Sequence, residues 1–296
     1  MHEPGRRNIS ALMSKRKRSG PAGNRPQGNQ RNMERGENET RPRHRPHGGG
    51  RPGKSGGDEH FLYGFHAVIA ALKNPARKPQ RLVLTRNAEA ELAAQGLAPG
   101  RGLALQPELA GAEEIAALLP SGAVHQGIAL KATPLPDLTL DEACEGTNLA
   151  IVLDQVTDPH NFGAILRSAA VFGAGALITT DRHSPPLGGV LAKAASGGLE
   201  LVKIAKVTNL ARALDELKDL DFEVIGLDGE GDVSLPEFGT APKVALVLGA
   251  EGAGLRRLTR EHCDILARLP AAGEMKSLNV SNAAAVALYE IARRRG

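Results

Sequence analysis

From residue 149 onward, short apolar runs alternate with longer amphipathic segments. The apolar runs predict buried strands at 149–153, 176–179, 201–204, 223–227, 244–248 and 265–268. The segments between and after them predict helices at 162–172, 188–196, 209–219, 255–261 and 280–294. Strands that are apolar throughout and separated by helices are typical of a parallel sheet covered on both faces. The pattern therefore predicts an α/β domain over 149–296.

A smaller α/β pattern precedes this domain, over residues 61–132. It predicts helices at 68–72, 89–95 and 112–119 and strands at 81–85 and 125–130. In Thr133–Asp137, two prolines block continued regular structure, so we expect 133–148 to be a linker.

Residues 1–60 carry neither pattern. They include 11 glycines, 6 prolines and only 7 hydrophobic residues, too few to offset the entropy of ordering, so we expect a disordered tail. Of the 37 basic and 33 acidic residues in the chain, the tail holds 14 and 6, which gives it a charge of +8 and leaves the remaining 236 residues at −4. Such a tail would attract phosphates. A solubilising leader without a specific role is an equal alternative.

The overall composition, 41% hydrophobic and 24% charged, is that of a globular protein. No apolar run approaches the roughly 20 residues of a membrane helix, so no membrane association is expected. The two cysteines are too few for a disulfide framework or a zinc site, so we expect no metal and a reducing compartment. The N-terminal charges are not followed by the apolar region of a secretory signal. We therefore expect a cytoplasmic protein.

Ligands of parallel sheets bind beyond the carboxyl ends of the strands, which directs attention to the loops there. After the first strand, Asn161 is placed to cap a helix beginning at Phe162. Arg167 follows about a turn and a half into that helix. Taken alone, Arg167 is better explained as a surface arginine whose stem lies on the helix.

Glycine clusters follow the fourth and fifth strands, at Gly226–Gly231 and Gly249–Gly254. Glycine allows tight turns and close approach of the main chain to a ligand. The order G-x-x-G-x-G is not that of a dinucleotide fold, and the expected acidic residue about 20 positions on is missing, which argues against an oxidoreductase. Two clusters at neighbouring strand ends favour a cofactor cradle made of main chain over plain turns.

Four polar residues precede or begin the last helix: Ser277, Asn279, Ser281 and Asn282. Capping a helix needs one such residue. The excess favours a polar site over redundant capping.

Together these segments resemble the three motifs of the SpoU/TrmH family of RNA 2′-O-ribose methyltransferases. The motif-like segments are Asn161–Arg167, Leu246–Gly254 and Leu269–Ser281, in the family's order and spacing. Residues 61–131 resemble the substrate-binding domain of the members that modify a guanosine of 23S rRNA, through Tyr63–Val68 and Ala123–Ile128.

The resemblance implies a parallel α/β sheet whose C-terminal segment forms a trefoil knot, and a homodimer with the active site at the subunit interface. It implies that S-adenosylmethionine is the cofactor and that Leu227, Gly249, Leu269 and Leu278 line its pocket. Arg167 would activate or orient the ribose hydroxyl, reaching the cofactor of the other subunit. Asn161, Glu251, Ser277 and Asn279 would fix Arg167 and the ribose, and Glu251 is a candidate to pair with Arg167.

The sequence thus predicts 2′-O-methylation of an rRNA ribose, on a guanosine of 23S rRNA. A tRNA 2′-O-methyltransferase of the same superfamily is the first alternative, and the 61–131 resemblance argues against it. The second is a non-catalytic RNA-binding or ribosome-assembly factor, against which the full set of site residues argues.

Overall fold

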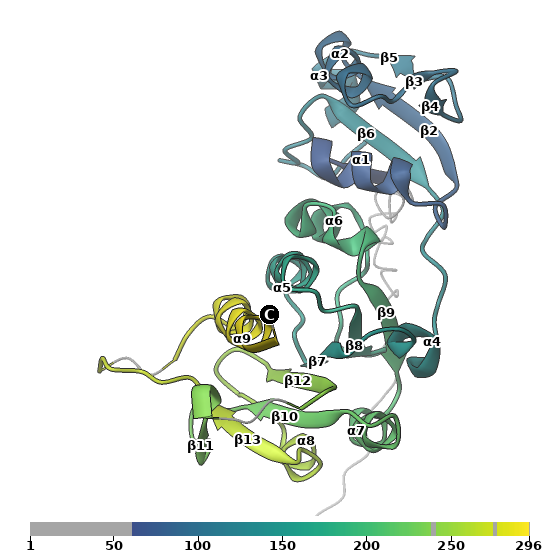
Figure 1. Cartoon of the computed structure of the whole chain (residues 1–296). Helices are drawn as coiled ribbons and strands as arrows, with labels where there is room; N and C mark the ends of the chain where they lie inside the picture. The colour runs from purple at the N-terminus through teal and green to yellow at the C-terminus, as the bar shows by residue number, and fades with distance from the viewer. Residues whose placement is uncertain (1–60, 238–240, 275–276, 296) are drawn as a thin grey trace, which may run out of the picture. The chain divides into compact units, whose positions relative to one another are not determined.

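The computed structural model of the protein describes residues 61–237, 241–274 and 277–295. The expected disordered tail lies outside these residues. Residues 61–132 build a small sheet and residues 149–295 a larger one, each packed against helices (Figure 1). The predicted class, α/β with a parallel sheet, is therefore confirmed.

The small sheet has the strand order β1-β6-β2-β5 and is mixed. β6 pairs antiparallel with both β1 and β2, and β5 runs parallel to β2. A separate two-stranded pairing joins β3 and β4. The elements are β1 Phe61–Tyr63, α1 Phe65–Lys73, β2 Pro79–Leu84, α2 Arg86–Ala94, β3 Ala98–Pro99, β4 Gly102–Leu103, β5 Glu108–Leu109, α3 Ala112–Ala116 and β6 Ile128–Ala132.

The large sheet has seven strands in the order β11-β13-β10-β12-β7-β8-β9, and every pairing is parallel. Its strands are β7 Leu149–Asp154, β8 Ala176–Thr180, β9 Lys203–Val207, β10 Glu223–Leu227, β11 Val233–Ser234, β12 Val244–Gly249 and β13 Ile265–Arg268. The helical elements are α4 Leu140–Cys144, α5 Pro159–Val171, α6 Gly189–Ala195, η1 Gly198–Glu200, α7 Leu210–Asp219, η2 Leu235–Glu237, α8 Arg257–Glu261 and α9 Val280–Arg295.

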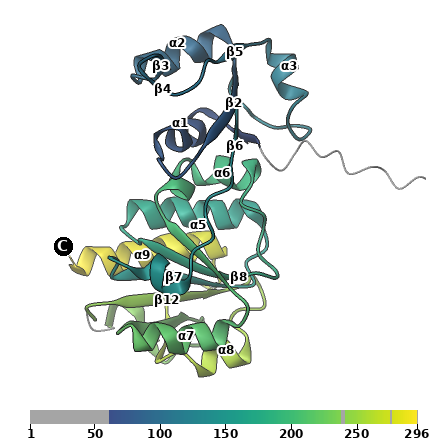
Figure 2. The ribbon, with the colours of Figure 1, turned by 90° about the vertical axis from the view of Figure 1, so that its right-hand side faces the viewer.

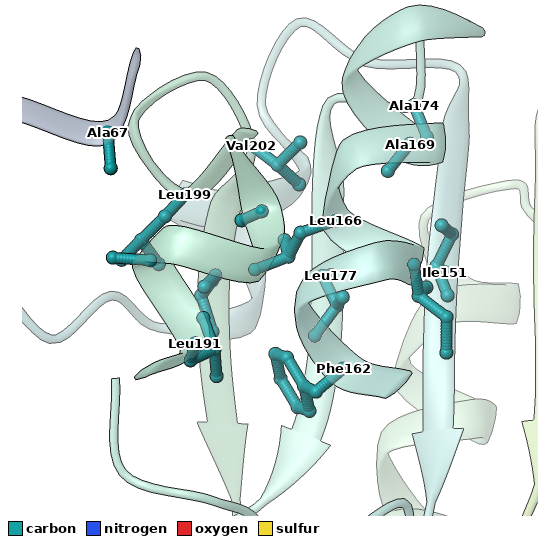
Figure 3. Close-up of a cluster of buried hydrophobic side chains, with 14 of the residues drawn as sticks. Ala67, Ile151, Phe162, Leu166, Ala169, Ala174, Leu177, Leu191, Leu199 and Val202 are labelled. Carbon is teal, nitrogen blue, oxygen red and sulfur yellow. The ribbon is translucent and has the colours of Figure 1, made fainter. Parts of the chain in front are cut away.

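Alternate residues of each strand face opposite sides of this sheet. On β7, Ile151 and Leu153 join the cluster under α5, α6 and α9, whereas Ala150 and Val152 join the cluster with α4 and α7. Figure 2 shows the two helical layers, with α5 and α9 on one face and α7 and α8 on the other. The first cluster includes the fully buried Phe162 (Figure 3), whose burial stabilises the fold by about 1.5–3 kcal/mol. This packing fixes α5, the helix that carries two predicted site residues.

The structure corrects several predicted boundaries. The strand predicted at 201–204 is β9 at 203–207, because Gly198 packs directly on the main chain of Leu166 and turns the chain into η1 first. The strand predicted at 125–130 begins at Ile128, since Gln126 and Gly127 have φ of 57° and 75°.

The predicted linker, 133–148, contains a helix. Thr139 and Glu142 form a capping box at the start of α4, and its Leu140, Ala143 and Cys144 are buried. The prolines keep the segment before Leu138 free of strand and helix, as predicted. The apolar pattern of so short a helix was too brief to be recognised.

Candidate functional site

The carboxyl ends of four strands lie side by side at one edge of the large sheet. Leu248 is in register with both Leu153 on β7 and Leu227 on β10, and Leu227 is in register with Ala267 on β13. The loops after these strands, which carry the three motif-like segments, therefore start from one place in the fold.

Asn279 joins these loops through its side-chain amide. Its Nδ2 donates to Asn161 Oδ1 at 3.0 Å and to Glu251 Oε2 at 3.3 Å. Its Oδ1 accepts from the backbone N–H of Ser281 at 2.9 Å and from the Ser281 hydroxyl at 2.6 Å. Both ends of the amide are engaged, so its orientation is fixed. We call Asn161, Glu251 and Asn279 the polar triad.

The first loop differs from its predicted form, because Asp158 and not Asn161 caps α5. Asp158 Oδ2 accepts from the backbone N–H of Asn161 at 2.9 Å, and Pro159 occupies the first turn. The Asn161 side chain is thereby left to bond Asn279. Its own Nδ2 has no protein acceptor within the described residues and is available to a substrate.

The loop after β12 folds back on itself. Gly254 N–H donates to Ala250 C=O at 2.9 Å, and Gly252 and Gly254 have φ of 81° and 66°. A Cβ on Gly249 would overlap the main chain of Gly254 and Leu255. Gly249 is therefore required by the closure of its own loop, which holds Glu251 exposed at the rim of the site.

The leucines expected to contact the cofactor lie at the same edge. Leu227 and Leu269 are half-buried at the ends of β10 and β13, and Leu278 is 54% exposed just before α9. A large apolar side chain that is exposed in a strand-end loop can contact the apolar part of a ligand. The arrangement fits an adenosine-containing cofactor, with apolar contacts beside a loop rich in main-chain groups.

Arg167 lies on a different face of α5 from Asn161. Six helical residues correspond to a rise of about 9 Å and a rotation of about 240°, so Arg167 points away from the triad of its own chain. It is exposed, and among the described residues no ion pair joins it to Glu251, so the pair considered from the sequence is not formed within the chain. Ser277 is also exposed and makes no side-chain hydrogen bond within the described part of the chain.

Exposed apolar side chains lie on α5 and α9, two helices that pack together, and one of these side chains is a turn from Arg167. Val171, one turn further on α5, is 69% exposed, and Val286 and Tyr289 on α9 are 48% and 54% exposed. Phe172 and Tyr289 contact edge to face, with ring centroids 5.9 Å apart. We call Val171, Val286 and Tyr289 the apolar patch.

Sequence reasoning missed the ion pairs at this edge, of which that of Asp154 is the more deeply buried. Asp154, the last residue of β7, is fully buried, and its carboxylate accepts from Arg256 Nε at 2.6 Å and from the Arg256 backbone N–H at 3.0 Å. A sequence signal for a buried partner was present, because Asp154 ends a strand that is otherwise apolar. This pair ties the first strand-end loop to the segment after the glycine loop.

Other reactive groups stay outside the site. Burial raises the pKa of Cys144 to about 11 and that of Cys263 to about 12, so neither is a thiolate nucleophile at neutral pH. Among the described residues there is no group of three or more His, Cys, Asp or Glu side chains suited to a metal ion. Nor does the described part of the chain include a helix long and apolar enough to span a membrane.

Comparison with known proteins agrees with this geometry. Residues 148–289 match the SpoU rRNA Methylase family, and residues 61–138 match the family of RNA 2′-O ribose methyltransferase substrate-binding domains. The 23S rRNA (guanosine-2′-O-)-methyltransferase RlmB of Pseudomonas aeruginosa is 40% identical over 256 residues, covering 79% of this chain and 96% of that protein. RlmB of Escherichia coli K12 is 39% identical over 247 residues, covering 79% and 98%.

A solved structure shares the fold. The AdoMet-bound rRNA methyltransferase from Sinorhizobium meliloti superposes with a TM-score of 0.64 at 26% identity, over 80% of this chain and 87% of that one. The relatives match nearly their whole length, and the three motif-like segments meet at one sheet edge. The chain belongs to the SpoU rRNA methylase family.

Proposed function

We propose that the protein transfers a methyl group from S-adenosylmethionine to the ribose 2′-hydroxyl of a guanosine in 23S rRNA. The RlmB relatives that match most of the chain are named for this reaction. The observation that carries the proposal is the polar triad, in which two half-buried asparagines and the exposed Glu251 are joined by hydrogen bonds beside the folded glycine loop.

In this proposal, Leu227, Gly249, Leu269 and Leu278 hold the cofactor. The side chains supply apolar contacts, and the main chain of the glycine loop supplies hydrogen bonds. When bound, the cofactor supplies an electrophilic methyl group on a sulfonium. The chain must then place the hydroxyl in line with that group, and positioning alone can lower the barrier by about 7–11 kcal/mol.

The triad suits the recognition of a ribose hydroxyl. Asn161 Nδ2 offers a donor, and Glu251 offers its second carboxylate oxygen, Oε1, beside the one that accepts from Asn279. Because a guanidinium has five N–H donors and no acceptor for a proton, Arg167 acts in this proposal by orienting the hydroxyl or phosphate and stabilising developing negative charge. Ser277 adds a hydroxyl at the same edge.

Arg167 reaches the triad from a partner subunit in this proposal. Its direction on α5, away from the triad of its own chain, supports action across a homodimer interface. The apolar patch beside it supports burial of that face, since monomers rarely leave neighbouring large apolar side chains exposed.

The same proposal assigns a role to each segment of the chain. Residues 61–132 bind RNA, 133–148 connect, and 149–296 form the catalytic domain with the family's trefoil knot. The knot is supported by the path of the chain, since β13 pairs between β10 and β11 whereas α9 returns to pack on α5. An rRNA substrate and two unpaired cysteines favour the cytoplasm.

The test is to map 2′-O-methyl groups in 23S rRNA and tRNA from a strain lacking the gene and from the complemented strain. We expect loss of one guanosine modification in 23S rRNA and its return on complementation. Loss confined to tRNA would overturn the rRNA assignment. An unchanged set of 2′-O-methyl groups would favour the non-catalytic alternative.

A further inference from the structure

A cavity opens at the same sheet edge, beyond β7, β8 and β9 and against the start of α8. Its volume is about 660 Å³. It is lined by Gln155, Thr180, Arg182, His183, Thr208, Asn209, Leu210, Ala211, Arg256, Arg257, Leu258 and Thr259. None of these residues belongs to the polar triad or to the leucines assigned to the cofactor.

The cavity lining is basic. It includes three arginines, Arg182, Arg256 and Arg257, and no carboxylate. Two of these arginines have a counterion: Asp154 is buried against Arg256, and Glu261 pairs with Arg257 at 2.5 Å. Arg182 forms no ion pair within the described residues, and the neighbouring Asp181 accepts from Thr208. In a half of the chain whose overall charge is negative, this concentration of guanidinium groups is suited to an anion.

Arg256 is held in a fixed orientation. The buried carboxylate of Asp154 accepts from both its backbone N–H and its Nε. Its two Nη groups make no hydrogen bond within the described residues, and its side chain is 47% exposed. A guanidinium anchored through Nε presents its remaining donors in one plane, the geometry that suits phosphate oxygens.

The rim of the cavity is strained. Gln155 and His183 have φ of 62° and 65°, a conformation that side chains other than Gly, Asn and Asp rarely adopt. Such outliers are concentrated at functional sites, because they persist only where the surroundings fix them. The exposed Leu258 adds an apolar surface at the same rim.

The cavity and the candidate methylation site share two loops. Gln155 begins the loop that leads into α5, whose first turn carries Asn161, and Arg256 lies two residues after Gly254 in the glycine loop that carries Glu251. A polynucleotide whose ribose lies at the polar triad has phosphates within a nucleotide or two on either side, so a basic cavity built on the same two segments is placed to contact them.

We propose that this cavity binds backbone phosphates of the RNA beside the target nucleotide, through Arg182, Arg256 and Arg257. The proposal rests on the proposed function, since the RNA strand that it binds is the substrate. Phosphate contacts fix the register of an RNA without reading its sequence. The cavity therefore contributes affinity and positioning, and the choice of nucleotide lies elsewhere.

The variants are Arg182→Gln, Arg257→Gln and both together. Arg256 is left intact, because its loss would leave Asp154 buried without a partner. The matched control is Arg293→Gln, an exposed arginine in the last turn of α9, where the neighbouring Arg295 bonds Asn148 at the opposite edge of the sheet. The probe is the 23S rRNA transcript with the full-length protein, over a series of salt concentrations.

We expect each cavity variant to weaken RNA binding and to lower the magnitude of the log–log salt slope by about 0.7–0.9, with the double variant losing about twice as much. The affinity for S-adenosylmethionine and the methylated nucleotide should stay the same. If the salt slopes of the cavity variants equal that of Arg293→Gln, the cavity is not a phosphate-binding subsite.

Methylation measured in the same samples separates this proposal from the proposed function. If the wild-type protein binds the transcript but methylates no ribose, while the cavity variants still lose salt dependence, the subsite stands and the proposed function is wrong. If the wild-type protein methylates the guanosine and the cavity variants match the control, the proposed function stands and the subsite is wrong. A wild-type protein that binds no RNA contradicts both.

Discussion

Asn279 Nδ2 donates a hydrogen bond of 3.0 Å to Asn161 Oδ1, across 118 positions of the sequence. The same amide caps the start of α9 through its oxygen. One side chain therefore both starts a helix and joins two strand-end loops. Its two functions can be separated, because a different atom of the amide serves each.

Asn279→Asp should abolish most activity while preserving the fold. The aspartate oxygen still accepts from Ser281, so the cap of α9 is kept. The donor to Asn161 is lost, and a second carboxylate faces Glu251, which repels it. We expect the methylation rate to fall by about 10²-fold or more, with the midpoint of thermal unfolding nearly unchanged.

Ser281→Ala is the control for this variant. It removes only the hydroxyl bond to Asn279 Oδ1 and leaves the backbone N–H bond and both donations in place. Its activity should stay within a few-fold of wild type. Normal turnover by Asn279→Asp would show that the polar triad is a structural cap and not part of the active site.

Gly249→Ala should impair cofactor binding through the shape of its loop. The added Cβ would overlap the main chain of Gly254, so the turn carrying Glu251 cannot close. Gly111→Ala is the matched control, because Gly111 lies outside both glycine clusters and a Cβ there meets only the end of the Glu114 side chain, at 3.4 Å. We expect calorimetric titration with S-adenosylmethionine to show strong loss for the first variant and near-normal affinity for the second. Equal affinities would contradict the assignment of the glycine loop to the cofactor.

Sequence reasoning predicted the parallel sheet because its signals, apolar strands separated by helices, are local and periodic. Strand ends directed attention to the loops that meet in the structure, and the family resemblance singled out Asn161, Glu251 and Asn279 within those segments. The cap of α5 was assigned to Asn161, but Asp158 is an equally good capping residue. Pro159, which suits the first turn of a helix, is the signal that favours Asp158. The helix α4 was missed because five residues give too little periodicity.

Contacts between distant residues were beyond such reasoning. The Asp154–Arg256 pair spans 102 positions, and nothing in the spacing of these residues identifies the partner. The contact that requires a glycine at position 249 was also not predicted, because the sequence assigned Gly249 to close approach of the cofactor. In the structure its missing side chain makes room for Gly254 of the same loop.

A buried ion pair gives a prediction about stability. Arg77 Nη2 and Glu200 Oε1 are 2.8 Å apart, and both side chains are only 3% exposed. Asn74 Nδ2 also donates to Glu200 at 2.7 Å. Removing one partner leaves the other charge buried, so Arg77→Met or Glu200→Leu alone should cost about 3–5 kcal/mol of unfolding free energy.

The double variant should cost less than the sum of the two single variants, because no charge is then left unpaired. Urea unfolding of the four proteins measures the coupling. Additive losses would mean that the pair is not formed in solution. Arg81→Met is the control, since Arg81 pairs with Glu108 at an exposed position, where such pairs contribute little.

The sharpest prediction concerns which subunit supplies Arg167. Arg167→Ala should lower the rate by about 10²–10⁴-fold with unchanged cofactor affinity, and Arg167→Lys should restore little, because an ammonium does not reproduce a planar two-pronged donor.

Mixing the inactive Arg167→Ala and Asn279→Asp proteins then decides the geometry. If Arg167 acts on the triad of its partner, each mixed dimer contains one site with both residues intact. Random exchange of subunits should restore about a quarter of wild-type activity. If Arg167 acts within its own chain, no subunit of the mixture has both residues, and activity stays at the level of the single variants. Methylation of the 23S rRNA transcript before and after subunit exchange provides the measurement, and a mixture that remains inactive despite verified exchange contradicts catalysis across the interface.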